Sequence, residues 1–253
     1  LPIAATHMGT ATIAVSDGAL EALSLTMNPT ADVDIPVQVS VPAGMTLEGV
    51  GVVVLLPDGL NAIRALFGSP AGPNPTVTVP AIAGARVVAM AQASDPSGGV
   101  ATTWSEPVAA TGTTVAVTLA EVPAMLTPAD AAVGIGLGDR FAVEDRAGLA
   151  YMFVVDPDVG GVGPFLGVTS LDAAIDLPDL TSLSSEFVIP PAQPYEWRVY
   201  AFGPFDAADQ LVQGVGVSAG WVELMTAGSL GFGDGPETAG WMMQTSDRTF
   251  TTP

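Results

Sequence analysis

The side chains of this 253-residue chain that could carry out chemistry are mostly carboxylates and tryptophans. The sequence contains 26 acidic residues, 6 basic residues that are all Arg, a single His and no Cys. A chain without Cys and Lys cannot form disulfides, thiolate metal sites, cysteine nucleophiles or lysine Schiff bases. The lone imidazole, His7, lies near the amino terminus, so we expect it to be exposed and not part of a Ser–His–Asp triad.

Carboxylates in glycine-rich loops make calcium the metal to consider, because calcium binds carboxylate and carbonyl oxygens. Asp156 and Asp158, in the segment Asp-Pro-Asp-Val-Gly-Gly, are the first candidates. No segment has the spacing of an EF-hand loop, and Asp is also frequent in ordinary turns. We therefore expect no cofactor, with calcium at these two residues as the alternative. Further candidates of the same kind are Asp32, Asp34, Asp172, Asp176 and Asp179.

The four tryptophans suggest a second kind of site. Trp221 and Trp241 belong to a glycine-rich stretch, where loops can present aromatic side chains to a carbohydrate. Trp197 instead lies in an alternating segment, which predicts a core position. Carboxylate pairs can also hydrolyse glycosides, but 26 acidic residues form such pairs by chance. We therefore expect a non-enzymatic protein, with a carbohydrate-binding module as the alternative and a glycan hydrolase as the third choice.

The charge and hydropathy of the chain limit its partners. A net charge of −20 should repel nucleic acids and anionic membrane surfaces. No run of 18 apolar residues is present, so no membrane span is expected. Only 13% of the residues are charged, about half the usual fraction, and Lys is absent. This composition favours a secreted, periplasmic or cell-surface protein of a bacterium, and the first residues lack the features of a signal peptide.

The distribution of Gly, Pro, Val and Thr predicts an all-β fold of two tandem, immunoglobulin-like β-sandwich domains. The 29 Gly and 22 Pro divide the chain into short segments, and alternating segments rich in Val and Thr predict strands. Two prolines between Glu121 and Pro128 suggest a joint. The expected domains are 1–122 and 123–253, the second with a glycine-rich insertion at about 204–240.

The expected strands alternate or are apolar on both faces. Alternation over 33–41 predicts one buried face, with Pro36 at an edge or at a break in the ladder. The apolar run 50–56 predicts a central strand, and 60–67 is either a helical turn or a strand. The remaining expected strands are 9–15, 21–27, 76–79, 85–93, 100–104, 113–119, 139–143, 150–155, 187–189, 195–202 and 247–252.

The second half of the chain resembles the fibronectin type III-like domains of bacterial secreted and surface proteins. The resemblance covers about residues 124–253 and lies in LTPADA at 126–131, RFAV at 140–143, AYMFVV at 150–155, YEWRVYA at 195–201 and RTFTT at 248–252. The first half is similar to prealbumin-like sandwiches, also known as carboxypeptidase-regulatory-like domains, in GARVVAMA at 84–91 and VAATGTTVAVTL at 108–119. Both resemblances imply adhesion, spacing or scaffolding and imply no catalysis.

Together these features predict a non-catalytic, exported β-sandwich protein of cell-surface or extracellular assembly, adhesion or scaffolding. Its expected partners are proteins or further copies of the chain, with a carbohydrate as the alternative. Lys usually protects the edges of exposed strands, and this chain has none. Assembly into an oligomer or filament through β-edge contacts is therefore part of the hypothesis.

Overall fold

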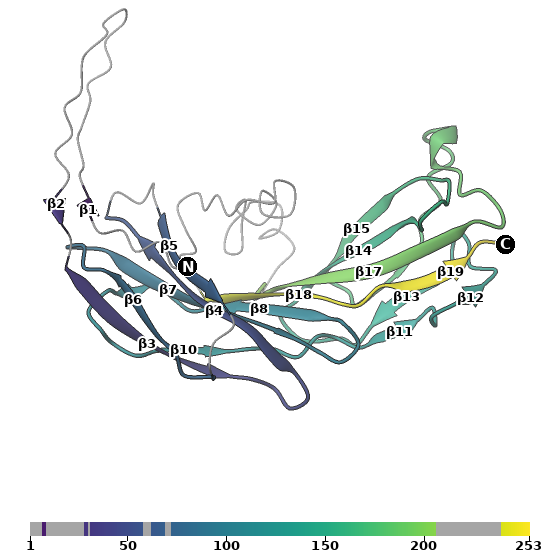
Figure 1. Cartoon of the computed structure of the whole chain (residues 1–253). Helices are drawn as coiled ribbons and strands as arrows, with labels where there is room; N and C mark the ends of the chain where they lie inside the picture. The colour runs from purple at the N-terminus through teal and green to yellow at the C-terminus, as the bar shows by residue number, and fades with distance from the viewer. Residues whose placement is uncertain (1–6, 9–27, 30, 58–61, 69–71, 206–238) are drawn as a thin grey trace, which may run out of the picture.

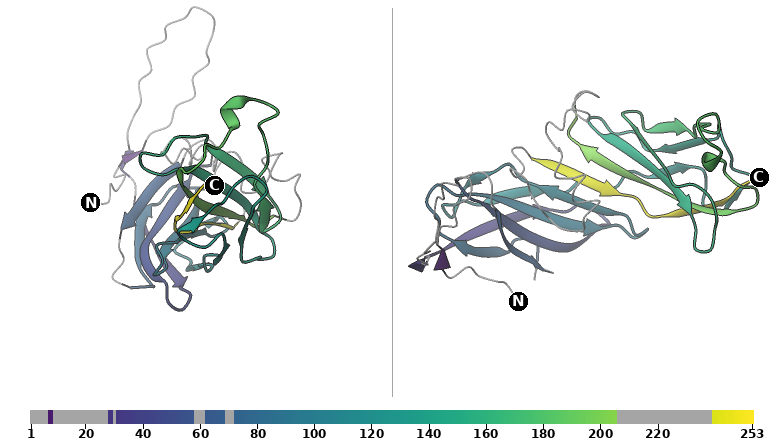
Figure 2. Two further views of the ribbon diagram at one scale, coloured as in Figure 1. Left: turned by 90° about the vertical axis from the view of Figure 1, so that its right-hand side faces the viewer. Right: turned by 90° about the horizontal axis from the view of Figure 1, so that it is seen from above.

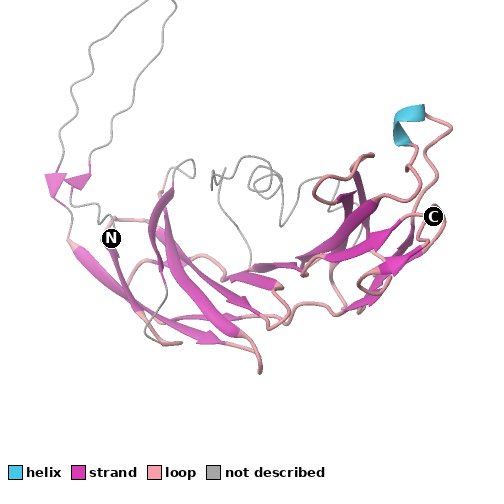
Figure 3. Cartoon of the chain, turned by 45° about the vertical axis from the view of Figure 1, so that its right-hand side comes forward, coloured by secondary structure: helices cyan, strands magenta, loops and turns pink. Residues whose placement is uncertain are grey.

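A computed structural model shows an elongated molecule with two β-rich lobes (Figure 1). The structure describes residues 7–8, 28–29, 31–57, 62–68, 72–205 and 239–253. The only helix within these residues is the three-residue 3₁₀ turn η1, Ser185–Phe187, which is cyan in Figure 3. The all-β prediction is therefore confirmed. No helix in the described part of the chain is long and apolar enough to cross a membrane.

The N-terminal lobe contains a three-stranded sheet and the first part of a much longer sheet. The three-stranded sheet has the order β10-β3-β6. Strands β4, β5, β7 and β8 belong to the long sheet, and β9 pairs with β7. A short pair, β1 and β2, lies apart from both sheets (Figure 1). The bounds are β1 His7–Met8, β2 Asn28–Pro29, β3 Asp32–Ser40, β4 Thr46–Leu55, β5 Ala62–Gly68, β6 Thr76–Pro80, β7 Arg86–Ser94, β8 Val100–Trp104, β9 Val108–Ala109 and β10 Val115–Thr118.

The C-terminal lobe repeats this sandwich-like arrangement. A three-stranded sheet with the order β11-β13-β16 accompanies the second part of the long sheet. In that part, β15, β14, β17 and β19 lie side by side in this order. Strand β12 pairs in parallel with β19. The bounds are β11 Met125–Thr127, β12 Ala132–Val133, β13 Arg140–Val143, β14 Ala150–Pro157, β15 Leu166–Ser170, β16 Ala174–Asp176, β17 Pro194–Gly203, β18 Gly240–Gln244 and β19 Arg248–Thr251.

Strand β18 joins the two lobes into one continuous sheet. It pairs with β8 from Gly240 to Gln244, and its other edge pairs with the end of β17. The chain then turns at Thr245 and continues as β19, which pairs with the beginning of β17. Two hydrogen bonds attach Thr245 to Val199 of β17. The Oγ1 of Thr245 accepts from Val199 N at 2.9 Å, and its N donates to Val199 O at 2.9 Å. Figure 2 shows this yellow segment running from one lobe to the other.

Two tryptophans at the joint each face a glycine on the neighbouring strand. Trp241 of β18 is the register partner of Gly203 in β17, and Trp104 of β8 is the partner of Gly240 in β18. A Cβ added at Gly203 would lie 2.6 Å from Trp241 Nε1, and one added at Gly240 would lie 2.5 Å from Trp104 Cζ2. Both glycines are therefore required by close packing of an indole against the neighbouring backbone.

One contiguous set of buried side chains runs through both lobes, from Ile35 to Phe250. Trp197 is fully buried in it and meets Phe141 edge to face, with ring centroids 5.1 Å apart. The predicted core position of Trp197 is thus confirmed. Strand β4 is buried on both faces, because Val52 and Val54 belong to this core while Val53 belongs to a second cluster on the opposite face. This confirms the prediction of a central strand.

Several local predictions differ from the structure in instructive ways. Pro36 lies in the middle strand of its sheet, but at the residue where β3 changes partners, from β6 before it to β10 after it. The expected strand at 187–189 is wrong, since 185–187 form η1 and 188–189 belong to no strand. Residues 62–68 form a strand. The expected strands 9–15 and 21–27 lie outside the described residues, as does most of the expected insertion, whose last residue begins β18.

The joint yields a first prediction. Gly240→Ala should lower the free energy of unfolding by about 1–3 kcal/mol, because the new methyl group forces Trp104 and the carbonyl of Gly203 apart. Urea unfolding followed by circular dichroism measures this change. Gly167→Ala in β15 is the matched control, since its Cβ would meet only Phe165 at 3.6 Å. Equal stability of the two variants would show that the close Gly–Trp contact does not constrain the joint.

Candidate functional site

One side of the N-terminal lobe is open along strand β10. Among the described strands, β10 ends the three-stranded sheet and pairs with β3 alone, in parallel register. Leu119 N donates to Ser40 O at 3.0 Å, so the odd-numbered residues of this segment direct their backbone groups toward β3. In a parallel pair the intervening residues direct theirs away from the partner. The N–H and C=O groups of Ala116 and Thr118, and of Thr114 just before the strand, therefore form a sheet edge that no other described strand covers.

A cavity of about 410 Å³ lies beside this free edge. The cavity lies between β10 on one side and the long sheet on the other. Its walls include Ala116 and Thr118 from β10 with Thr114 just before it, Thr103 from β8 with Glu106 just after it, and Trp241 from β18. Its volume falls in the range of ligand-sized pockets, about 300–1,000 Å³. The cavity thus combines backbone donors and acceptors, hydroxyl-bearing residues, one carboxylate and two tryptophans, Trp104 and Trp241.

The polar and aromatic groups of this cavity have distinct environments. Trp241 is half-buried, with its Nε1 edge against Gly203 and the rest of its packing against the core. Thr103 is its register partner on β8 and is 6% exposed. The Oγ1 of Thr103 is buried without a hydrogen-bond partner among the described residues. An unpaired buried hydroxyl carries a desolvation cost that a bound group could relieve.

The structure places only one of the two predicted carbohydrate-binding tryptophans. Trp241 does line a cavity, although it is a wall of the lobe joint and not a loop platform. Trp221 lies outside the described residues. The sequence analysis did not identify Thr103 or the edge residue Ala116, because both belong to ordinary Val- and Thr-rich segments. Only the alternation of 113–119 pointed to a strand there, and alternation does not show which edge stays free.

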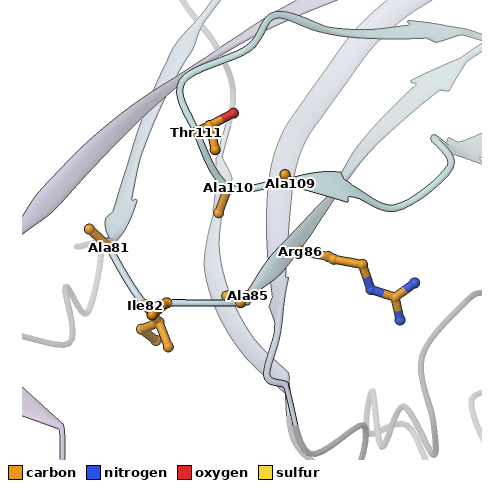
Figure 4. A pocket seen from close by; sticks show the side chains of 9 residues that line it. Ala81, Ile82, Ala85, Arg86, Ala109, Ala110 and Thr111 are labelled. Carbon is orange, nitrogen blue, oxygen red and sulfur yellow. The ribbon is translucent and has the colours of Figure 1, made fainter.

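A second cavity, of about 360 Å³, lies at the end of the same lobe (Figure 4). Its lining consists mainly of small side chains, including Ala81, Ala85, Ala109 and Ala110. Arg86 is the only charged residue in its described lining, and its guanidinium points away from the alanines in Figure 4. The described residues around this cavity include no general base or metal ligand, so they define no chemical site.

Four charged side chains form the densest polar cluster in the described part of the chain. Arg198 of β17 contacts Asp156 at 2.7 Å, Glu196 at 3.0 Å and Asp247 at 3.1 Å. Asp156 and Glu196 are direct register partners on β14 and β17, so two like charges face each other across the sheet. The guanidinium that lies between these carboxylates compensates their repulsion.

The environment of this cluster shifts two pKa values. Burial raises the pKa of Glu196, the hydrogen bond from Arg198 opposes this change, and Asp156 and Asp247 raise the pKa further. For Arg198, burial lowers the pKa, but hydrogen bonds to Asp247 and Glu196 and the charge of Asp156 outweigh burial and raise it. The arginine therefore stays charged, and Glu196 is the carboxyl that takes up a proton more readily than usual.

The predicted calcium ligands do not converge in this structure. Asp156 is bound to Arg198, while Asp158 Oδ1 accepts a hydrogen bond from Val159 N within its own turn. Three of the other five candidates also have side-chain partners, since Asp34 accepts from Thr78, Asp176 pairs with Arg140, and Asp179 accepts from Thr181. The described residues contain no group of three or more His, Asp or Glu arranged to hold a metal ion. Calcium at Asp156 and Asp158 stays a prediction.

The remaining arginines of the C-terminal lobe stabilise loops. Arg146 contacts Glu144 at 2.9 Å and Glu121 at 3.2 Å. Arg248 follows Asp247 in the sequence but donates to the carbonyls of Met125 and Pro128, at 2.8 and 3.1 Å. These two bonds attach the segment that enters the lobe to strand β19.

No protein-family model matches this chain, and no curated protein sequence matches it.

The charged cluster yields a second prediction. Arg198→Gln should lower the free energy of unfolding by about 1–3 kcal/mol at pH 7, because three carboxylates lose their shared partner. The loss should be smaller at pH 5. A folded-state pKa above the unfolded value means that the native state binds the proton more tightly, so stability falls as pH rises from about 4.5 through the raised pKa. Protonation at low pH relieves the repulsion.

Urea unfolding at both pH values measures this effect. Arg140→Gln is the control, because its pair with Asp176 spans 3.7 Å and both side chains are about two-thirds exposed. That variant should change stability by less than about 0.5 kcal/mol at either pH. An equal loss for Arg198→Gln at pH 5 and pH 7 would contradict the role assigned to the carboxylate repulsion.

Proposed function

We propose that this chain is a non-catalytic, exported protein that acts as a spacer or scaffold in cell-surface or extracellular assembly or adhesion. The observation that carries this proposal is strand β18, which is bonded to β8 of one lobe and to β17 of the other. A linker of single chain lets two lobes reorient, whereas a shared strand resists bending because bending breaks backbone hydrogen bonds. A fixed separation between its ends is what a spacer requires.

The strand order supports placing the C-terminal lobe among fibronectin type III-like domains. In such sandwiches a sheet of three or four strands faces one built from the third, sixth and seventh strands. Here β11-β13-β16 accompany a sheet in which β14, β17 and β19 are neighbours. The proposal keeps the prealbumin-like assignment for the N-terminal lobe. It also keeps the boundary between the two domains near residue 122, except that β18 pairs with strands of both lobes.

Exposed apolar loops support a role in contacts with other proteins. All large hydrophobic side chains that are strongly exposed in the described part of the chain belong to residues 126–188. Val133 at the end of β12 and Val159 and Val162 in the loop after β14 are 79%, 98% and 67% exposed, and they lie near the carboxyl end of β19. Gly134 N and Asp158 N tie these two segments to Thr251 O and Pro194 O. Exposed apolar groups of this kind are typical of interaction sites.

The composition supports export to the periplasm, the cell surface or the medium. The chain has few charges, no Lys and no Cys that oxidation could damage. A carbohydrate-binding module is the second candidate function, favoured by the position of Trp241 on a cavity wall. A glycan hydrolase stays the third candidate, and the close pair Asp156 and Glu196 is held by Arg198 in the structure.

A distance measurement between the lobes tests the spacer proposal. Because the chain has no Cys, single nitroxide labels can be attached at Ala43→Cys and Ser182→Cys, which are exposed positions in different lobes. We expect a single narrow distance distribution from double electron–electron resonance. Labels at Ala43→Cys and Ala83→Cys, both in the N-terminal lobe, give the width due to the labels alone. A distribution between the lobes that is much broader than this control would overturn the proposal.

A further inference from the structure

The long sheet is wider than the sheet that covers it in the N-terminal lobe. Strand β6 lies over β5 and β4, and β10 lies over β7 and β8. Strand β18 extends the long sheet beyond β8, but the three-stranded sheet has no strand beyond β10. The cavity beside Trp241 lies where a further strand next to β10 would pack against β8 and β18.

The free edge of β10 has the hydrogen-bonding groups that an added strand needs. Thr114, Ala116 and Thr118 direct their N–H and C=O groups away from β3, and no bond to another described residue occupies them. Their side chains are exposed, whereas Val115 and Val117 point into the core. No Lys, Pro or bulge protects this edge, and these are the features by which proteins usually block edge pairing.

We propose that the edge of β10 binds an extended segment of a partner protein by β-strand addition, with one side chain of that segment in the cavity in front of Trp241. This site rests on the proposed role in assembly and gives that role a defined contact. Main-chain bonds to Thr114, Ala116 and Thr118 supply affinity, and the cavity selects a side chain.

The charge of the chain selects among the possible occupants. Glu106 is the only charged residue among the described residues that line the cavity, and the chain carries a net charge of −20. An acidic strand, including one from a second copy of this chain, would be repelled on approach. The occupant is therefore a neutral or basic segment whose alternate residues are apolar, and affinity should fall as salt concentration rises.

Amide exchange in the free protein, measured residue by residue with NMR, tests the edge itself. The N–H groups of Ala116 and Thr118 should exchange rapidly, whereas those of Val117 and Leu119, which face β3, should be protected. Slow exchange of Ala116 and Thr118 in the free protein would overturn the proposal, because the edge would already be occupied.

Binding is tested with the synthetic peptide Lys-Thr-Val-Thr-Val-Thr-Lys. We expect the peptide to slow exchange of the Ala116 amide and to change the indole resonance of Trp241. The same peptide with N-methylated valines, or with Glu in place of Lys, should bind at least tenfold more weakly. Equal binding of all three peptides would overturn the proposal.

Two variants of one position separate edge pairing from other binding modes. Ala116→Pro removes the central donor of the edge and should weaken peptide binding at least tenfold. Ala116→Thr keeps the N–H group and should bind as the unaltered protein does. If the proline variant fails to fold, the N-methylated peptide tests the same bond from the other side. Unchanged binding to Ala116→Pro would contradict strand addition.

Two further outcomes would assign the site to another occupant and thereby overturn the proposal. The first is a shift of the Trp241 resonance by oligosaccharides such as cellohexaose and xylohexaose, with no effect of the peptide. The second is growth of particle mass with protein concentration, measured by light scattering and abolished in Ala116→Pro, which would show pairing of two copies. The distance measurement between the lobes is independent of all these results, so failure of the spacer proposal is distinguishable from failure of the edge site.

Discussion

The arrangement of this protein depends on the backbone hydrogen bonds of β18, which occupy both edges of that strand. Five residues of β18 pair with β8, and four pair with β17. These partners are separated from it by long stretches of sequence, so closing the sheet has an entropic cost that burial at the joint must offset. The burial is provided by Trp104, Trp241 and Met243, and two glycines make room for the indoles. The shared core and the alignment of the lobes both follow from this strand.

The same strand explains why one side of the molecule stays open. Strand β18 widens the long sheet in the N-terminal lobe but adds nothing to the sheet that covers it. The result is a cavity between a free edge and a wall that carries Trp241. The joint between the two lobes and the cavity beside β10 thus share one structural cause.

The scarcity of cations determines how the acidic C-terminal lobe is held together. Arg198 contacts three carboxylates and Arg146 contacts two, so each guanidinium compensates several negative charges. Arg suits this role because its planar group offers several donors at fixed angles. Arg248 binds carbonyl groups instead, which shows that a charged neighbour in the sequence does not identify the partner.

The sequence by itself determined the local properties of the chain. Alternation over 33–41 and the apolar run 50–56 predicted strands and their buried faces, and the position of Trp197 predicted burial. Only the tertiary structure decided that 240–244 bonds to both lobes, that Asp156 pairs with Arg198, and that β10 pairs with β3 alone among the described strands. The physical reason is that side-chain patterns encode which face of a strand is buried. Backbone N–H and C=O groups are the same in almost every residue, so the choice of pairing partner leaves little trace in any one segment.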